Sequence, residues 1–538
     1  MKRWNGWGDD KNNLDFELST SSRDFIEMRL GKSTPLEDAS FEDVLAKVPK
    51  SRLPEHPLIS TQAEDRLRHS RGQSIPDWLA MRSGDFGIFP DGVAYPESTE
   101  QVQELMALAY EKDFEVIPYG GGTSVVGHIN PLASERGVLT IDMGRMNRLV
   151  SLNEESQIAT FGAGTPGPQV EAQLRAKGYT LGHFPQSWEL ATVGGWVASR
   201  SSGQQSLRYG RIEQMFAGGT LVSPRGNLVV PTIPATSAGL DIREVLLGSE
   251  GRMGIITEVQ MRVTPIATQE QFFVVFLPSF EEAKRAVRSI VQERIPLSML
   301  RVSNALETET QLKLAGHEKQ IGLLESYLSL RGVKDGKCMV TFGVTGNKQQ
   351  NKTSLKQSKR IFKSLGGVSG PKMMGEKWAE NRFKFPYLRE NLWLEGYVVD
   401  TFETATDWDN VSELMNTMEE SVRNSLQDEG VKPHVYTHLS HMYAQGCSIY
   451  TTYIFPNAQS YEATLERWKK IKAAACSTLA TGRSTISHQH GVGKDHAPYL
   501  EAEKGALGMG AIKSLLSFFD PKQKLNPGTL VDEKIDVK

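Results

Sequence analysis

Cysteine is scarce in this chain of 538 residues, and several other features are missing as well. Its three cysteines, Cys338, Cys447 and Cys476, form no Cys-x-x-Cys pair. This excludes a disulfide framework and predicts reduced thiols in an intracellular setting. No apolar run approaches the ~18 residues of a membrane span. Residues 1–13 lack the apolar core of a secretion signal, and the last three residues are not Ser-Lys-Leu. We expect a soluble, cytoplasmic protein, and a greasy substrate taken from a membrane surface is compatible with it.

Strong charge of either sign is also absent. The net charge is -3, so the chain has no overall electrostatic footprint for nucleic acid. Hydrophobic residues make up 39% and charged residues 23%, which is typical of globular proteins. Because 538 residues exceed what one core accommodates, two or three domains are expected.

The pattern along the chain predicts four regions. Residues 1–85 form a partly helical leader, and residues 86–268 form a first domain. In the first domain, Ser98 caps a helix with Val102, Leu105, Met106 and Ala109 at helical spacing. Residues 269–480 repeat strand-then-helix units, which predicts an α/β domain whose helices cover one sheet. Residues 481–538 are irregular and are expected to return to the first domain.

The most informative segment is Pro118-Tyr119-Gly120-Gly121-Gly122-Thr123-Ser124, which follows a short apolar run. Three residues without Cβ let the backbone curl so that several N–H groups point at one spot, which suits phosphate oxygens. The hydroxyl groups that follow can add donors. The segment therefore predicts a phosphate-bearing ligand rather than a flexible surface turn.

A second glycine motif, Gly162-Ala163-Gly164-Thr165-Pro166-Gly167, matches the dinucleotide pattern G-x-G-x-x-G, and Glu189 lies where a ribose-binding acid is expected. However, Pro166 and Pro168 remove N–H groups where a Rossmann helix offers them to pyrophosphate. We interpret this motif as a tight strand-to-helix turn.

Several motifs follow one another in an order that resembles the vanillyl-alcohol-oxidase superfamily of flavoproteins. They are residues 118–124, Thr192-Val193-Gly194-Gly195-Trp196-Val197-Ala198, Tyr209-Gly210, residues 248–256 and the C-terminal His-Gly-Val-Gly. Within it, the pattern is similar to the alkyldihydroxyacetonephosphate synthase family over roughly residues 86 to 530. The resemblance implies an α+β fold. A PCMH-type FAD-binding domain of two subdomains would be followed by a cap domain with helices covering an antiparallel sheet.

By that resemblance the chain binds FAD without a covalent link. Gln186 stands where the family usually has Asp, and His128 is not expected to attach the flavin. The residues that the resemblance assigns to FAD are Pro118, Tyr119, Gly120, Gly121, Gly122, Thr123, Ser124, Gln186, Ser187, Thr192, Gly194, Gly195, Ser199, Ser202, Glu250, Gly251, Gly254, Ile255 and Ile256.

Ser487-His488-Gln489-His490 is the strongest candidate for chemistry near the C-terminus. If this segment is extended, His488 and His490 share a face and Gln489 points the other way. The family has three histidines in a row here, and Gln489 cannot exchange a proton. A pair of structural histidines is one alternative. A metal site is another, with partners among three histidines at helical spacing, but no accompanying acid or cysteine supports it, so we predict no metal. Those three are His434, His438 and His441.

By resemblance, Tyr450 is the catalytic tyrosine, Arg389 binds the substrate phosphate, and Arg301 supports the site. A phenol with a free pKa of ~10 needs an activating neighbour, which His488 or His490 would supply. Without the resemblance, Tyr450 would be a buried strand residue and Arg389 would form a surface salt bridge, to Glu390 or Glu395. A guanidinium fork suits a phosphate or a carboxylate.

The resemblance implies a transferase of ether lipid synthesis, which exchanges the acyl group of an acyl-dihydroxyacetone phosphate for a fatty alcohol. Homodimerisation is expected from the family only. Two alternatives stay open: an FAD-linked dehydrogenase or oxidase of a 2-hydroxy acid or alcohol, and an FAD- or lipid-binding protein without chemistry.

Overall fold

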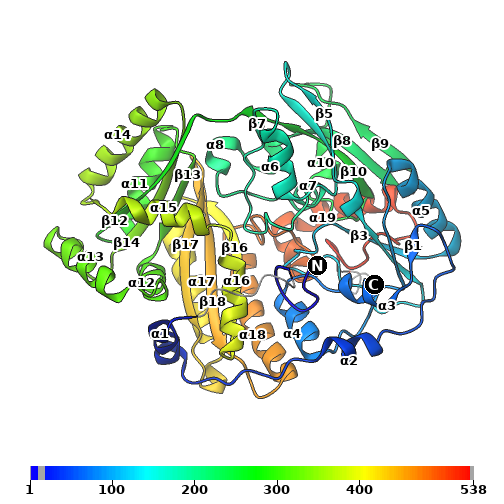
Figure 1. The fold of residues 1–538 in the computed structure, drawn as a ribbon, viewed down its shortest axis with the longest axis horizontal. Coiled ribbons are helices and arrows are strands. Elements are labelled where there is room, and N and C mark those ends of the chain that lie inside the picture. Colours follow the sequence, from blue (N-terminus) through cyan, green and yellow to red (C-terminus); the bar gives the residue numbers. More distant parts are fainter. Residues whose placement is uncertain (1, 10–17, 533–538) are drawn as a thin grey trace.

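The computed structural model describes residues 2–9 and 18–532. The chain has a seven-stranded sheet and two smaller sheets of four and five strands. The large sheet and its helices lie beside the region that holds the smaller sheets (Figure 1). The leader, residues 18–85, is partly helical as predicted, and it runs along both regions. Its helices are α1 (Thr20–Leu30), α2 (Phe41–Ala46), α3 (Ala63–Arg68) and α4 (Ile75–Ser83).

The first small sheet positions the glycine-rich loop. Its strands lie in the order β1-β2-β4-β3, and β2, β4 and β3 run parallel. Helix α5 (Thr99–Lys112) precedes β3, and it begins at the predicted cap, since the Ser98 side chain accepts a hydrogen bond from Gln101 N. Its predicted apolar positions are all buried. The strands are β1 (Ile59–Ser60), β2 (Gly92–Ala94), β3 (Glu115–Tyr119) and β4 (Val138–Asp142).

The second small sheet is antiparallel, in the order β5-β6-β10-β8-β9. Strand β10 (Ile255–Arg262) alternates buried and half-buried side chains from Thr257 onward, so one of its faces is packed against the core. Its other strands are β5 (Leu149–Asn153), β6 (Ile158–Gly162), β8 (Phe216–Ser223) and β9 (Gly226–Val230), and its helices are α6 (Gly167–Arg175), α7 (Val193–Ser199), α8 (Ser206–Tyr209), α9 (Ile212–Met215) and α10 (Arg243–Leu246). A short pair, β7 (Tyr179–Thr180) with β11 (Thr264–Pro265), flanks it.

The cap sheet is antiparallel throughout, in the order β15-β12-β14-β13-β17-β18-β16. Its strands are β12 (Gln269–Leu277), β13 (Met299–Ser303), β14 (Cys338–Gly346), β15 (Val368–Ser369), β16 (Tyr397–Asp407), β17 (His434–Met442) and β18 (Gly446–Pro456). Helices α11 (Phe280–Gln292), α14 (Lys348–Ser364), α17 (Val411–Asn424) and α18 (Tyr461–Thr481) pack on it, and α12 (Ala305–Leu314), α13 (Glu318–Leu330), α15 (Lys372–Asn381) and α16 (Phe385–Leu394) complete the cap. The predicted strand-then-helix units are confirmed.

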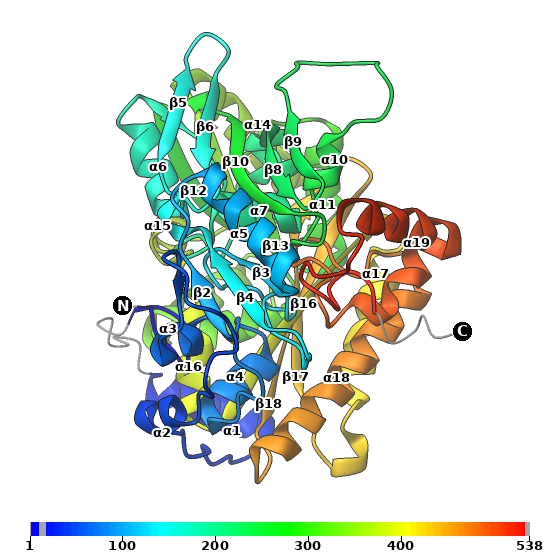
Figure 2. The same cartoon turned by 90° about the vertical axis from the view of Figure 1, so that its right-hand side faces the viewer.

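The C-terminal segment returns to the first region, but the expectation that it is irregular is wrong, because residues 500–519 form a helix. Helix α19 (Leu500–Phe519) packs near α18, and both lie on the right in Figure 2. Beyond it, Val116 N donates to Lys524 O at 2.9 Å and Asn526 N donates to Val116 O at 2.8 Å. Leu525 thereby extends the edge of β3 as a parallel bridge.

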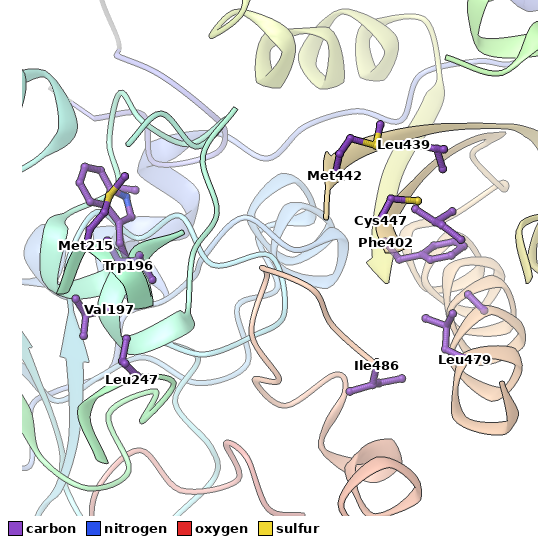
Figure 3. Packing of buried hydrophobic residues seen from close by; sticks show 14 of the residues in the cluster. Trp196, Val197, Met215, Leu247, Phe402, Leu439, Met442, Cys447, Leu479 and Ile486 are labelled. Carbon is purple, nitrogen blue, oxygen red and sulfur yellow. The ribbon is translucent and has the colours of Figure 1, made fainter. Parts of the chain in front are cut away.

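One cluster of buried apolar side chains runs through both regions. Figure 3 shows part of it, with Trp196 and Val197 of α7 on one side and Phe402, Leu439 and Cys447 of the cap sheet on the other. In the described part of the chain, no helix is long and apolar enough to cross a membrane.

Candidate active site and cofactor cavity

A deep cavity lies between the glycine-rich loop and the cap sheet. Strands β16 and β18 pair so that Thr401 and Tyr450 face it, and α16 contributes Arg389. The residues around it include Trp7, Gln73, Trp78, residues 118–125, His128, Gln186, Ser187, Thr192, Gly194, Gly195, Ser199, Ser201, residues 249–251, residues 254–256, Phe385, Pro386, Leu388, Arg389, Val399, Thr401, Tyr450, Gln489, His490 and Asn526.

The glycine-rich loop fits the diphosphate of a dinucleotide. A Cβ on Gly121 would lie 1.9 Å from Leu190 O, and one on Gly120 would lie 2.4 Å from Thr192 Oγ1. Gly122 has φ +65°, a conformation that favours glycine. Among the described residues, no acceptor takes a hydrogen bond from the backbone N–H groups of residues 121–124. These N–H groups are thus free to bind oxygens of a ligand.

The other residues predicted for FAD line the same cavity, with one exception. Ser202 is wrong as a cavity residue, because its hydroxyl lies 3.3 Å from His441 Nδ1, behind the wall, while its neighbour Ser201 lines the cavity. The Glu250 carboxylate mainly holds the C-terminal segment in place, because it accepts hydrogen bonds from Val492 N at 2.6 Å and Gly493 N at 2.8 Å.

Both ring nitrogens of His128 face protein groups. Nδ1 lies 2.7 Å from Ser124 Oγ, and Nε2 lies 2.9 Å from Glu250 Oε2. A histidine engaged at both nitrogens is a poor attachment point for a flavin.

The competing motif at residues 162–167 is a strand-to-helix turn, as interpreted. Strand β6 ends at Gly162 and α6 begins at Gly167. A Cβ on Gly164 would lie 1.7 Å from Met143 O, so this glycine permits close packing of protein backbone. The alternative ribose acid, Glu189, accepts a hydrogen bond from Tyr387 Oη at 2.9 Å.

Tyr450 stands on the cap side of the cavity between two histidines. Its ring stacks on His438 at a centroid distance of 4.7 Å and meets His490 edge-on at 5.9 Å. Its Oη lies 3.0 Å from Thr401 Oγ1 and 3.3 Å from Gln186 Oε1. Burial raises the pKa of Tyr450 and lowers the pKa of both histidines. At neutral pH the phenol is therefore protonated and the two imidazoles are uncharged.

The expectation that His488 and His490 share a face is wrong. Gln489 and His490 line the cavity, and His488 turns away from it. The segment bends instead of extending, because His488 N donates to Glu403 O at 3.0 Å and Gly491 adopts φ +81°. His488 is thus not the direct neighbour that Tyr450 was expected to have.

His488 instead belongs to a buried polar cluster. Its Nε2 accepts from Arg211 Nη1 at 2.6 Å and lies 2.7 Å from Tyr443 Oη, and its Nδ1 lies 3.2 Å from Glu403 Oε1. Since a guanidinium can only donate, the ring proton is on Nδ1, facing the carboxylate. Burial alone would raise the pKa of Glu403, but His488, His441 and His490 lower it well below its usual value.

Glu403, His441 and His488 bring their ligand atoms within 4.8 Å of one another, a geometry that a metal ion could use. Of the three alternative partners, His441 lies in this cluster. The helical spacing was wrong, since His434, His438 and His441 belong to a strand, and the expected lack of an acid was wrong because Glu403 is present. Arg211 already brings a cation to this cluster, which disfavours a second one.

The two arginines lie at different depths. Arg389 lines the cavity, donates to Gln73 O and pairs with Asp400 Oδ1 at 3.3 Å, rather than with Glu390 or Glu395. Arg301 lies behind Tyr450, where it pairs with Glu307 and lies 3.1 Å from His438 Nδ1, which is itself 3.0 Å from Glu307 Oε1. Arg301 therefore supports the histidine that stacks on Tyr450.

Several cavity residues were not found from the sequence. Two of them, Val399 and Thr401, come from a strand that carries no motif. Three come from the leader, namely Trp7, Gln73 and Trp78, and Asn526 comes from the C-terminal segment that returns to the first region. Only Asn526 had a signal, the expectation that the tail folds back.

Comparison with known proteins agrees with this geometry. A family model described as "FAD binding domain" matches residues 90–231, and one described as "FAD linked oxidases, C-terminal domain" matches residues 266–530. The chain is 31% identical over 476 residues to alkyldihydroxyacetonephosphate synthase of Dictyostelium discoideum, covering 87% of this chain and 77% of that protein. The enzyme of the same name from Trypanosoma brucei brucei is 30% identical, with 88% and 78% covered.

The chain belongs to the alkyldihydroxyacetonephosphate synthase family. A solved structure of an alkyldihydroxyacetonephosphate synthase superimposes with a TM-score of 0.81 at 27% identity, and 98% of each chain is covered. The α+β fold expected from this family is confirmed, and the cofactor is FAD.

Proposed function

We propose that this chain is an FAD-dependent alkyldihydroxyacetonephosphate synthase. It replaces the acyloxy group of an acyl-dihydroxyacetone phosphate by the alkoxy group of a fatty alcohol, and a fatty acid leaves. The observation that carries the proposal is the single cavity in which the diphosphate loop, Arg389 and Tyr450 meet, in a chain of this family. The reaction is redox-neutral overall, and bound FAD, held without a covalent bond, supplies the chemistry that activates the substrate carbon.

Arg389 binds the substrate phosphate in this proposal. Its guanidinium points into the cavity beside Trp78, over whose ring it lies at 5.3 Å. The bonds to Gln73 and Asp400 fix its orientation and leave further N–H groups for a phosphate oxygen. The phosphate head group is thereby held at the end of the cavity that α16 lines. The reacting carbon of the substrate then lies beside Tyr450.

Tyr450 handles the proton in this proposal. Because burial raises its pKa, the phenol begins the reaction as a donor, and Thr401 and Gln186 hold its oxygen. His490 is the nearest cavity base that can take the proton, while His488 acts through Glu403 without touching the cavity. Gln489 stands at the middle position of the family's three histidines and contributes hydrogen bonds only.

The test is incorporation of a labelled fatty alcohol into acyl-dihydroxyacetone phosphate by the FAD-loaded protein. Tyr450→Phe is expected to lower the rate at least ~100-fold, the usual size of an acid–base contribution. Tyr461→Phe, whose hydroxyl bonds to Glu37 O outside the cavity, is the matched control and should keep full activity.

The proposal fails if no label is incorporated while a 2-hydroxy acid bleaches the flavin anaerobically, since that outcome identifies a dehydrogenase. An unchanged rate in Tyr450→Phe would remove this tyrosine from the chemistry. Homodimerisation, a cytoplasmic location and contact with a membrane surface stay predictions.

A further inference from the structure

The first described residues form a small hairpin against the cofactor cavity. Lys2 and Asp9 pair as an antiparallel bridge, and Arg3 N donates to Gly8 O at 3.0 Å. We call residues 2–9 the N-terminal hairpin. Its Trp7 lines the cavity, so the hairpin is part of the wall.

Lys2 attaches this hairpin to the glycine-rich loop. Its Nζ donates to Tyr119 Oη at 2.6 Å and to Gly121 O at 2.8 Å. A Cβ on Gly122 would lie only 2.2 Å from this Nζ, so the ammonium occupies the space that a side chain there would fill. Within the described residues, Lys2 forms no ion pair, and the ammonium therefore lacks a carboxylate in contact with it.

The contact with Gly121 O fixes the direction of one peptide. In a planar trans peptide, the C=O and N–H groups point in opposite directions. Because the Gly121 carbonyl points at Lys2, the Gly122 N–H points away from it. That N–H belongs to the set that finds no acceptor among the described residues. Lys2 thus holds the loop in the conformation that presents its donors.

We propose that the N-terminal hairpin is a working part of the FAD site, in which Lys2 orients the loop of residues 120–124 and supplies cationic charge against the FAD diphosphate. The diphosphate brings two negative charges to this loop, and a partly buried ammonium without a contacting carboxylate complements them. This role rests on FAD as the cofactor and is independent of the lipid substrate. Lys2 is a positioning residue because it acts through the loop.

The charge state of Lys2 also gives a pH signature. Burial lowers the pKa of Lys2 to about 8, and Asp142 acts against this shift. The groups around Lys2 are the Tyr119 phenol, whose pKa burial raises, the Arg68 guanidinium, which donates to Lys2 O at 2.7 Å, and the Asp142 carboxylate, whose Oδ2 lies 2.8 Å from His69 Nε2. A bound diphosphate favours the ammonium, so FAD affinity should fall as pH rises from 7 through about 8 to 9.5.

The test is titration of the deflavinated full-length protein, tagged at its C-terminus, with FAD and with riboflavin. Lys2→Met is expected to weaken FAD binding about 10-fold at pH 7, because the loop loses its charge-assisted bond at Gly121 O and a nearby positive charge. Riboflavin lacks the diphosphate, so its affinity should stay the same. Lys2→Arg keeps the charge and should retain most of the FAD affinity. In Lys2→Met the fall in FAD affinity between pH 7 and 9.5 should disappear.

Lys32→Met is the matched control, because the Lys32 side chain is 86% exposed. Equal FAD affinity in the wild type and Lys2→Met would overturn the proposal. So would an equal loss of FAD and riboflavin affinity together with a lower melting temperature, because that pattern describes a merely structural hairpin. Neither readout uses the lipid reaction, so a failure here is separate from a failure of the proposed function.

Discussion

Burial governs the protonation of the groups around Tyr450. The same desolvation that raises the pKa of this phenol lowers the pKa of His438, His490 and His441, the last to about 3. The site therefore contains neutral acid–base groups, and Glu403 and Asp400 bring negative charge near Tyr450. Because Glu403 and Tyr450 are directly opposite in the pairing of β16 with β18, this charge is close to the chemistry.

Replacing Glu403 by Gln should destabilise the protein strongly at neutral pH. The carboxylate faces His488 and accepts a hydrogen bond from Ser440 Oγ at 2.7 Å, so removing its charge breaks a buried network at a cost of about 3 kcal/mol. Its pKa is lower in the folded than in the unfolded protein, where it is about 4.3. The stabilisation is thus fully present above about pH 4.3 and is lost as the pH falls toward the folded value.

Thermal melts of the wild type and Glu403→Gln at several pH values measure this effect. The gap in melting temperature should be full at pH 7 and should narrow below about pH 4.3. Glu413→Gln, at an exposed position of α17, is the control and should melt like the wild type. A gap that is independent of pH would contradict the role of the charge.

At the scale of elements, the sequence predicted what depends on local chemistry. The cap of α5, the alternation in β10 and the loop at residues 120–122 follow from side-chain spacing or from missing Cβ atoms. The bend at His488 was not predictable, because its backbone bond to Glu403 joins residues 85 positions apart in the sequence. Ser202 was misplaced for a similar reason, since a turn decides which of two adjacent serines lines the cavity.

The loop between β3 and β4 should lose its cofactor when Gly121 becomes Ala. The added Cβ would lie 1.9 Å from Leu190 O. Because this is a backbone atom, it cannot move aside without moving the chain around it, so the loop must shift. An overpacking cost of about 2 kcal/mol corresponds to FAD affinity about 30-fold weaker. Fluorescence titration with FAD measures it. Gly322→Ala, in α13 with open space around the new Cβ, is the control, and an equal effect in both variants would refute the argument.

At the scale of the whole molecule, the cavity is assembled from segments far apart in the chain. The first region supplies residues 118–125 and 249–256, the cap supplies Arg389 and Tyr450, and the C-terminal return supplies His490 and Asn526. No local pattern predicts Val399 or Thr401, because strand pairing across the cap sheet puts them there. The family resemblance identified the ligand, and the fold determines which side chains reach it.

This assembly predicts that FAD links the stability of both regions. A ligand that binds only the folded protein stabilises it by about 2.7 kcal/mol at 100 times its Kd. Because the buried apolar cluster also runs through both regions, the added stability should be shared rather than confined to the loop region. In scanning calorimetry, excess FAD should raise the melting temperature of one common transition. Riboflavin, which lacks the diphosphate, should raise it less. If FAD shifts only one of two separate transitions, the cap does not share the cofactor site, and the position of Tyr450 beside it would have to be given up.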